Sequence, residues 1–198
     1  MVLIQVYDEE ENSVSFAVSA VQNTSGSNEL VIHAVVPQAT ATPTAGDQPT
    51  TGTKYTWSIA QPLIQEIAAA GFSTVKVSVQ SVSVIIPVEE LSAFTREAFL
   101  ITVEAVNTET LPASVQGAMG GMTIQTAPHK FFVQNKAADE MILVSFDLPE
   151  GALPEDYQIV SINGEVIGYP EATLSVSGGI SSLQANVLNG SICFLAMK

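Results

Sequence analysis

The side chains that could do chemistry or carry a modification are few and widely spaced in this sequence. The two histidines, His33 and His129, belong to no H-x-H or H-E-x-x-H pattern, so their spacing indicates no metal site. The single cysteine, Cys193, lies in an apolar run and has no partner for an intrachain disulfide. N-glycosylation sequons begin at Asn23 and Asn189, and we expect both matches to be coincidental. We therefore expect structural or surface histidines and a buried, unreactive thiol.

Patterns for nucleophilic or phosphate chemistry are missing as well. No serine has the flanking glycines of a G-x-S-x-G elbow, although a Ser–His–Asp site or a cysteine–histidine pair could assemble from distant residues. The pairs Gly120-Gly121 and Gly178-Gly179 do not match a phosphate-binding loop. Aromatic residues make up 7% of the chain, which is sparse for a glycosidase cleft. The sequence predicts no enzyme and no catalytic, cofactor-binding or metal-binding residue.

Two acidic loops are the candidates for binding a cation through oxygen atoms, the ligands that Ca²⁺ prefers. The first is the run Asp8–Asn12, and the second contains Glu150, Glu155 and Asp156. The first run lacks the alternating spacing and the glycine of an EF-hand loop. We expect both loops to be solvated turns and the protein to need no cofactor, with calcium at the interface of an extracellular assembly as the alternative.

The composition limits the classes of partner. Among 198 residues, 20 are acidic and 6 are basic, and the net charge is −14. This balance argues against nucleic acid and against anionic membrane surfaces, because both require clustered lysine and arginine. Charged residues are only 13% of the chain, below the usual quarter, so Ser, Thr, Asn and Gln must cover the surface, as in extracellular and virion β-proteins. No apolar stretch approaches the roughly 20 residues of a membrane span, so no membrane insertion is expected.

The N-terminal sequence MVLIQVYDEEE has no basic region and is not a signal peptide. We expect either a product whose signal was removed or one that folds in the cytoplasm, and Met1 favours a complete gene product. The range 1–37 should form N-terminal strands in an antiparallel meander, and 38–53, rich in Thr, Pro and Gly, should be a linker or loop. The predicted strands of this meander are Met1–Tyr7, Ser13–Gln22 and Glu29–Val36.

The range 54–107 has the strongest local pattern and predicts a βαββαβ module. Pro62 is placed to start a helix that Gly71 ends, and Pro87 starts a second short helix. Between the helices, alternation around Gln80-Ser81 predicts a hairpin with one buried face. The apolar residues of that hairpin are Val75, Val77, Val79, Val82, Val84 and Ile86.

The last part of the chain reads as a loop-rich connection over 108–139 and a C-terminal β domain over 140–198. Asn163-Gly164 is the strongest hairpin signal there, because a type I′ turn needs positive φ at both central residues. Short strands separated by such turns are typical of a sandwich or barrel. The predicted fold is mainly β (α+β), with antiparallel sandwich-like sheets, two short proline-started helices and two subdomains.

The order of these elements resembles a βα module of Gram-positive bacterial surface proteins, which are often anchored by S-layer homology repeats. The resemblance rests on the helix closed by Gly71, the valine hairpin and the helix Pro87-Val88-Glu89-Glu90-Leu91 in 54–107, and on the strand and turn Val144–Gly151 in 140–198. It implies an extracellular, non-catalytic spacer or display module. A phage that infects such a bacterium could carry the same fold.

The function expected is that of a non-enzymatic structural or interaction protein of an extracellular assembly, first a virion component such as a capsid decoration, fibre or tail protein. A secreted cell-envelope module or adhesin is one alternative, and a carbohydrate-binding or hydrolytic β-domain is another. The expected partners are copies of the protein or neighbouring structural subunits, and the location is the virion or the cell surface. Because few charges protect its strand edges, we expect Met1–Tyr7 or the valine hairpin to pair with a neighbouring subunit.

Overall fold

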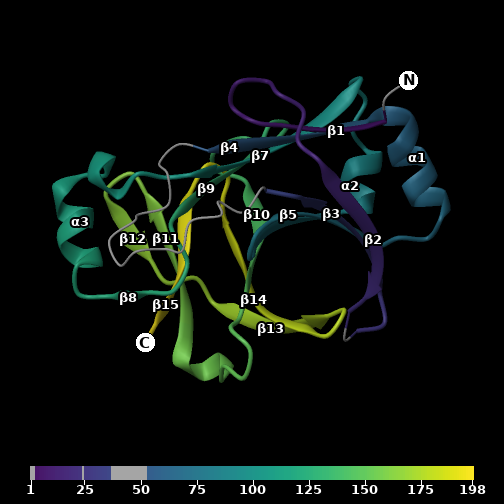
Figure 1. The fold of residues 1–198 in the computed structure, drawn as a ribbon. Coiled ribbons are helices and arrows are strands. Elements are labelled where there is room, and N and C mark those ends of the chain that lie inside the picture. The colour runs from purple at the N-terminus through teal and green to yellow at the C-terminus, as the bar shows by residue number, and fades with distance from the viewer. Residues whose placement is uncertain (1–2, 24, 37–52) are drawn as a thin grey trace.

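The computed structural model describes residues 3–23, 25–36 and 53–198, which form two β-sheets and three short helices (Figure 1). The predicted mainly β fold with sandwich-like sheets is confirmed. Of the predicted linker 38–53, all but Thr53 lies outside the described residues.

Sheet A has the strand order β1-β4-β7-β9-β15-β11-β12, and β8 also pairs with β15. Every pairing in it is antiparallel. Its strands are β1 (Ile4–Tyr7), β4 (Lys54–Ala60), β7 (Ala98–Ala105), β8 (Thr123–Ile124), β9 (His129–Val133), β11 (Tyr157–Asn163), β12 (Val166–Gly168) and β15 (Ile192–Met197).

Sheet B has the strand order β13-β14-β10-β6-β5-β3-β2, with β3 and β5 parallel and the other pairs antiparallel. Because β6 pairs with β10, the ranges 54–107 and 140–198 contribute adjacent strands to this sheet. Its strands are β2 (Phe16–Gln22), β3 (Asn28–Ala34), β5 (Thr74–Val79), β6 (Val82–Pro87), β10 (Met141–Asp147), β13 (Ala172–Ser177) and β14 (Ile180–Leu188).

Two of the helices are those that the prolines predict. Pro62 lies in the first turn of α1 (Gln61–Ala69), and Pro87 is the N-cap of α2 (Val88–Ser92). Gly71, with a φ of 80°, follows the end of α1 in the left-handed conformation that the sequence predicts. The helices contact each other at one end of the molecule (Figure 1) and place Ile64, Ile67, Val88 and Leu91 in the main core.

A third helix, α3 (Ala113–Met119), lies within the predicted loop-rich connection over 108–139, where the sequence pattern does not predict a helix. Pro112 is its N-cap, and a 3₁₀ turn (Thr108–Thr110) precedes it. Val115 and Met119 are four positions apart, so both face the side of sheet A that is turned away from the main core. The packing of Val115 and Met119 against β11 and β15 stabilises this helix, although Gly117 lies inside it.

The main core lies between the sheets and contains most of their largest buried side chains, whereas Phe194 packs in the smaller cluster beneath α3. Trp57, Phe99 and Phe131 come from sheet A, and Phe146 comes from sheet B. Phe131 and Phe146 meet edge to face across the two sheets, with ring centroids 5.9 Å apart. A second 3₁₀ turn (Pro154–Asp156) leads into β11 at the margin of this core.

The N-terminal strands do not form the predicted meander. β1 pairs with β4 in sheet A, whereas β2 and β3 form a hairpin in sheet B. The acidic turn allows one bridge, between Tyr7 and Ser13, and then the chain crosses to the other sheet. The alternation of Phe16 and Val18 in β2 predicts a buried face, but both are exposed because none of the described helices and strands covers β2 at the edge of its sheet.

The two predicted hairpins have different outcomes. β5 and β6 pair around Gln80-Ser81 with the expected register. They lie in the middle of sheet B, so the expectation that this hairpin pairs with a neighbouring subunit is wrong. In the second hairpin Asn163 pairs with Val166, and the turn is therefore Gly164-Glu165 rather than Asn163-Gly164. Only Gly164 has positive φ there, which is the requirement of a type II′ turn at its first position.

Candidate functional site

The acidic run Asp8–Asn12 forms a turn that satisfies its own carboxylate. Asp8 Oδ1 accepts hydrogen bonds from the backbone N–H groups of Glu10 (3.0 Å) and Asn12 (2.9 Å), and Oδ2 accepts one from the Asn12 side chain (3.2 Å). These bonds, above all the backbone bond from Asn12, lower the pKa of Asp8. Both carboxylate oxygens of Asp8 are therefore already hydrogen-bonded within the turn.

The second acidic loop places Glu150, Glu155 and Asp156 at the exposed surface around the turn that precedes β11. Within residues 3–23, 25–36 and 53–198, no group of three or more histidine, cysteine or acidic side chains is arranged to hold a metal ion. Calcium shared with a neighbouring subunit stays a prediction.

Cys193 and Asn189 are both buried in the sandwich. Cys193 lies in β15 on the face that packs into the main core, and burial raises the pKa of its thiol to about 12. Asn189 follows β14 and is 4% exposed. Its Oδ1 accepts from Val133 N–H (2.8 Å), and its Nδ2 donates to the carbonyls of Val133 (3.0 Å) and Lys136 (2.8 Å). The asparagine of the second sequon therefore has a structural role, because its hydrogen bonds hold the β9–β10 connection in place.

A polar cluster lines the face of sheet B opposite the main core. The sheet curls until the ends of its outer strands meet, where Asn23 and Ser177 form a bridge (Figure 1). Glu29, 4% exposed, accepts hydrogen bonds there from Thr74 Oγ1 (3.1 Å) and Ser177 Oγ (3.2 Å). The alternating sequence pattern predicts that these polar side chains are solvated, but the curled sheet encloses them.

Within the part of the chain that the structure describes, the one hydrogen bond between a serine and a histidine side chain lies on the same face. Ser78 Oγ lies 2.8 Å from Nδ1 of His33, and Lys76 Nζ lies 3.9 Å from Asp147 Oδ1. Desolvation raises the pKa of Asp147, against the opposing charges of Lys76 and His33. A nucleophilic serine needs open space beside its hydroxyl, but Ser78 is 5% exposed in mid-sheet. The cluster is explained by packing of the curled sheet.

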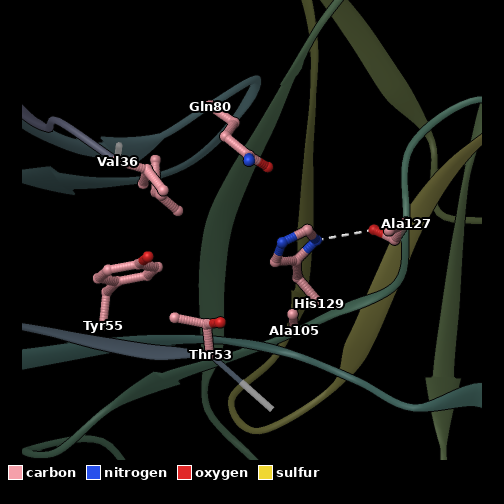
Figure 2. A pocket seen from close by; sticks show the side chains of 8 residues that line it. Val36, Thr53, Tyr55, Gln80, Ala105, Ala127 and His129 are labelled. Atoms are coloured by element: carbon pink, nitrogen blue, oxygen red, sulfur yellow. Dashed lines mark hydrogen bonds between the residues drawn. The ribbon is translucent and has the colours of Figure 1, made fainter. Parts of the chain in front are cut away.

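A pocket of about 120 Å³ opens between the two sheets beside His129 (Figure 2). His129 begins β9 and lies opposite Ala105 in β7 and Cys193 in β15. The small side chains of Ala105 and Ala127 leave room beside the imidazole ring. The other lining residues come from the ends of β3, β4 and β5: Val36, Thr53, Tyr55, Val79 and Gln80.

The protonation of His129 is set by one hydrogen bond and by burial. Its Nδ1 lies 2.7 Å from the carbonyl oxygen of Ala127, which accepts a proton, so Nδ1 carries the hydrogen and Nε2 carries the lone pair. Burial lowers the pKa of His129, and the Ala127 carbonyl opposes this more weakly. Burial also raises the pKa of Tyr55, with a contribution from Asp8 and Glu9. The pocket therefore contains a neutral imidazole and a protonated phenol at neutral pH.

Acidification should destabilise the protein through His129. Between the unfolded-state pKa of 6.5 and the lowered folded pKa, the unfolded chain binds more protons, so stability is lost as the pH falls. Relative to His129→Gln, the wild type should lose up to about 1.4 kcal/mol between pH 7.5 and 5.5, measured by urea unfolding. An unchanged difference between the two proteins over this range would contradict a buried, neutral His129.

A second hollow, of about 440 Å³, lies between β13 and the turn that precedes β11. Tyr157 and Tyr169 line it together with Leu174, and Glu155 and Lys198 add charges of both signs. Tyr169 is 57% exposed. The sequence indicates the acidic loop beside this hollow but not Tyr157 and Tyr169. These two tyrosines come close together only through the pairing of β11 with β12.

The outer strands of sheet B expose uncharged backbone edges. β2 has the sequence FAVSAVQ and is exposed on both faces, with Phe16 36% and Val18 49% accessible. β13, ATLSVS, exposes Leu174. The edges of sheet A are better protected, because β12 has three residues and the backbone of Val14 bonds to that of Val6 (2.7 Å) outside β1.

Comparisons with protein-family models, curated proteins and solved structures find no match for this chain. Among the helices of the described residues, none has the length and apolar character needed to cross a membrane.

Proposed function

We propose that the protein is a non-enzymatic structural protein that assembles with further copies of itself through the edge of β2. We place it in an extracellular assembly, first in a virion as a capsid decoration, fibre or tail component, and alternatively in a cell envelope as a module or adhesin. The observation that carries the proposal is the seven-residue edge strand β2, which is exposed on both faces and contains no charged residue.

Such an edge is unusual for a protein that acts alone. Monomeric β-proteins protect edges with lysine, proline, bulges or short strands, since unpaired N–H and C=O groups recruit other strands. β2 has none of these features between Phe16 and Gln22. The antiparallel edge of one β2 is complementary to the same edge of a second copy related by a two-fold axis. Pairing of two copies would join their seven-stranded sheets and cover Phe16 and Val18.

The charge distribution favours an uncharged edge such as β2 over the acidic surfaces for contact between copies. The chain has a net charge of −14, so most approaches of two copies bring like charges together. The uncharged β2 edge avoids placing like charges directly opposite each other. Screening of the remaining repulsion predicts that association strengthens with salt.

Light scattering coupled to size-exclusion chromatography, over a range of protein and salt concentrations, tests this assembly. The wild type should form dimers or larger species, and Val18→Lys should raise the dissociation constant at least about tenfold, because each copy would bring a lysine into the strand pairing. Val166→Lys, on the 69% exposed Val166 of β12, is the matched control and should leave the mass unchanged. A wild-type monomer at high concentration, or an oligomer insensitive to Val18→Lys, would refute it.

A carbohydrate-binding domain is the second candidate, favoured by the hollow lined by Tyr157 and Tyr169. Aromatic rings supply an apolar face with a polar tip, and Glu155 and Gln158 supply hydrogen-bonding groups beside them. Retardation of the wild type in gels that contain soluble polysaccharides, lost in Tyr169→Ala, would support this candidate. Equal mobility of both proteins in all such gels would argue against it.

A further inference from the structure

We propose that the pocket beside His129 binds a compact, neutral ring molecule that donates one hydrogen bond to Nε2 of His129. The proposal concerns a different surface from β2 and does not depend on assembly. Its basis is an imidazole with a fixed tautomer inside a small pocket with apolar walls. Figure 2 shows one ring nitrogen turned to Ala127 and the other turned to the space bounded by Val36, Tyr55 and Gln80.

The hydrogen bond to Ala127 defines which partner the ring can take. Because Nδ1 donates to that carbonyl, Nε2 offers a lone pair and therefore accepts. A ligand must then supply an N–H or O–H group at this point. An aprotic ring of the same shape would cover this acceptor without pairing it, which costs binding free energy.

The walls define the size and shape of the ligand. Val36, Val79, Ala105 and Ala127 present hydrocarbon surface around about 120 Å³. An apolar cavity of about 150 Å³ in another protein holds benzene, so this pocket suits a ring of about five heavy atoms. Flat rings fill such a space with little loss of conformational freedom.

The polar residues of the pocket favour a neutral ligand. None of the eight lining side chains other than His129 is basic or acidic, and Asp8 and Glu9 act on Tyr55 from nearby, which disfavours an anion. Gln80 is the first residue of the two-residue turn between β5 and β6, where its φ is 52°, as such turns require. Its side-chain amide lines the pocket and adds a neutral hydrogen-bonding group to the wall.

Titration of the full chain with pyrrole and with furan, followed by ¹H–¹⁵N NMR, tests the proposal. The two rings have the same size, but only pyrrole carries an N–H donor. Pyrrole should shift the amide signals of Gln80, Ala105 and His129 and bind about tenfold more tightly than furan. Equal binding of both rings, or no shift at these residues with about 10 mM pyrrole, would overturn the proposal.

Two variants separate the hydrogen bond from the cavity. His129→Phe keeps a ring in place but removes the acceptor, so it should abolish the preference for pyrrole. Ala105→Leu fills the pocket and should weaken both rings, while His129 still donates to Ala127. A preference for pyrrole that persists in His129→Phe would assign the acceptor elsewhere and refute the role of Nε2. The comparison of the two rings on the wild type needs neither variant to fold.

Discussion

Replacing Asn189 by alanine is expected to lower the free energy of unfolding by about 3 kcal/mol. The Asn189 side chain makes three hydrogen bonds to backbone groups of Val133 and Lys136, and it is buried. Alanine would leave one N–H and two C=O groups without these partners in a place with little access to water. Each unsatisfied buried group costs about 1–3 kcal/mol, and partial rehydration reduces the sum.

The effect should be local as well as global. Lys136 bonds to Met141 O (2.9 Å) and forms an ion pair with Glu90 of α2 (3.2 Å), so the β9–β10 connection links Asn189 to that helix. Amide hydrogen exchange in Asn189→Ala should therefore accelerate first between β9 and β10. Asn186→Ala, at an exposed asparagine of β14, is the matched control and should change stability by less than about 0.5 kcal/mol. Similar losses of unfolding free energy in both variants, measured by urea unfolding, would contradict the proposed role of the Asn189 hydrogen bonds.

Local backbone requirements explain which parts of the fold could be predicted from sequence. The hairpin around Gln80-Ser81 and the end of α1 at Gly71 depend on residues within one or two turns of the chain. Pro62 and Pro87 start helices for the same reason, since a missing N–H costs nothing in a first turn. These features follow from short-range steric restrictions and do not depend on contacts with distant residues.

Distant pairing explains the parts that could not be predicted. The alternation in β1 is compatible with either sheet, and only its antiparallel fit to β4 decides between them. The same alternation in β2 cannot show that the strand lies at the edge of its sheet, with both faces uncovered by the part of the chain that the structure describes. α3 lacks a strong sequence pattern because Gly117 interrupts it, and its burial on sheet A stabilises it.

The candidate sites were still less accessible to sequence reasoning. The sequence shows His129 as one of two histidines, but its pocket also needs Tyr55, Gln80 and Ala105 from three other strand ends. Asn189 matched a sequon, although its burial and three backbone contacts are produced by residues more than fifty positions away. The pairs Pro128-His129 and Asn189-Gly190 are local signals in the sequence. Neither pair indicates which distant residues surround the histidine or the asparagine.

Replacing Phe131 by alanine should be the most damaging single truncation in β9, with a loss of about 4 kcal/mol. The Phe131 ring is fully buried and meets Phe146 of the opposite sheet edge to face. Its removal deletes a large apolar contact and leaves a cavity between sheets whose backbone pairing limits collapse. Guanidinium unfolding followed by circular dichroism measures the loss.

Phe132→Ala is the control that makes this prediction specific. Phe132 has the same side chain and lies in the same strand one residue later, but it is 40% exposed. Successive side chains in a strand point to opposite faces, so this variant should lose less than about 1 kcal/mol. A slip of β9 by one residue against β7 would exchange the two environments, and the larger loss would then belong to Phe132→Ala. The ratio of the two losses therefore tests the register that positions both Phe131 in the core and His129 in its pocket.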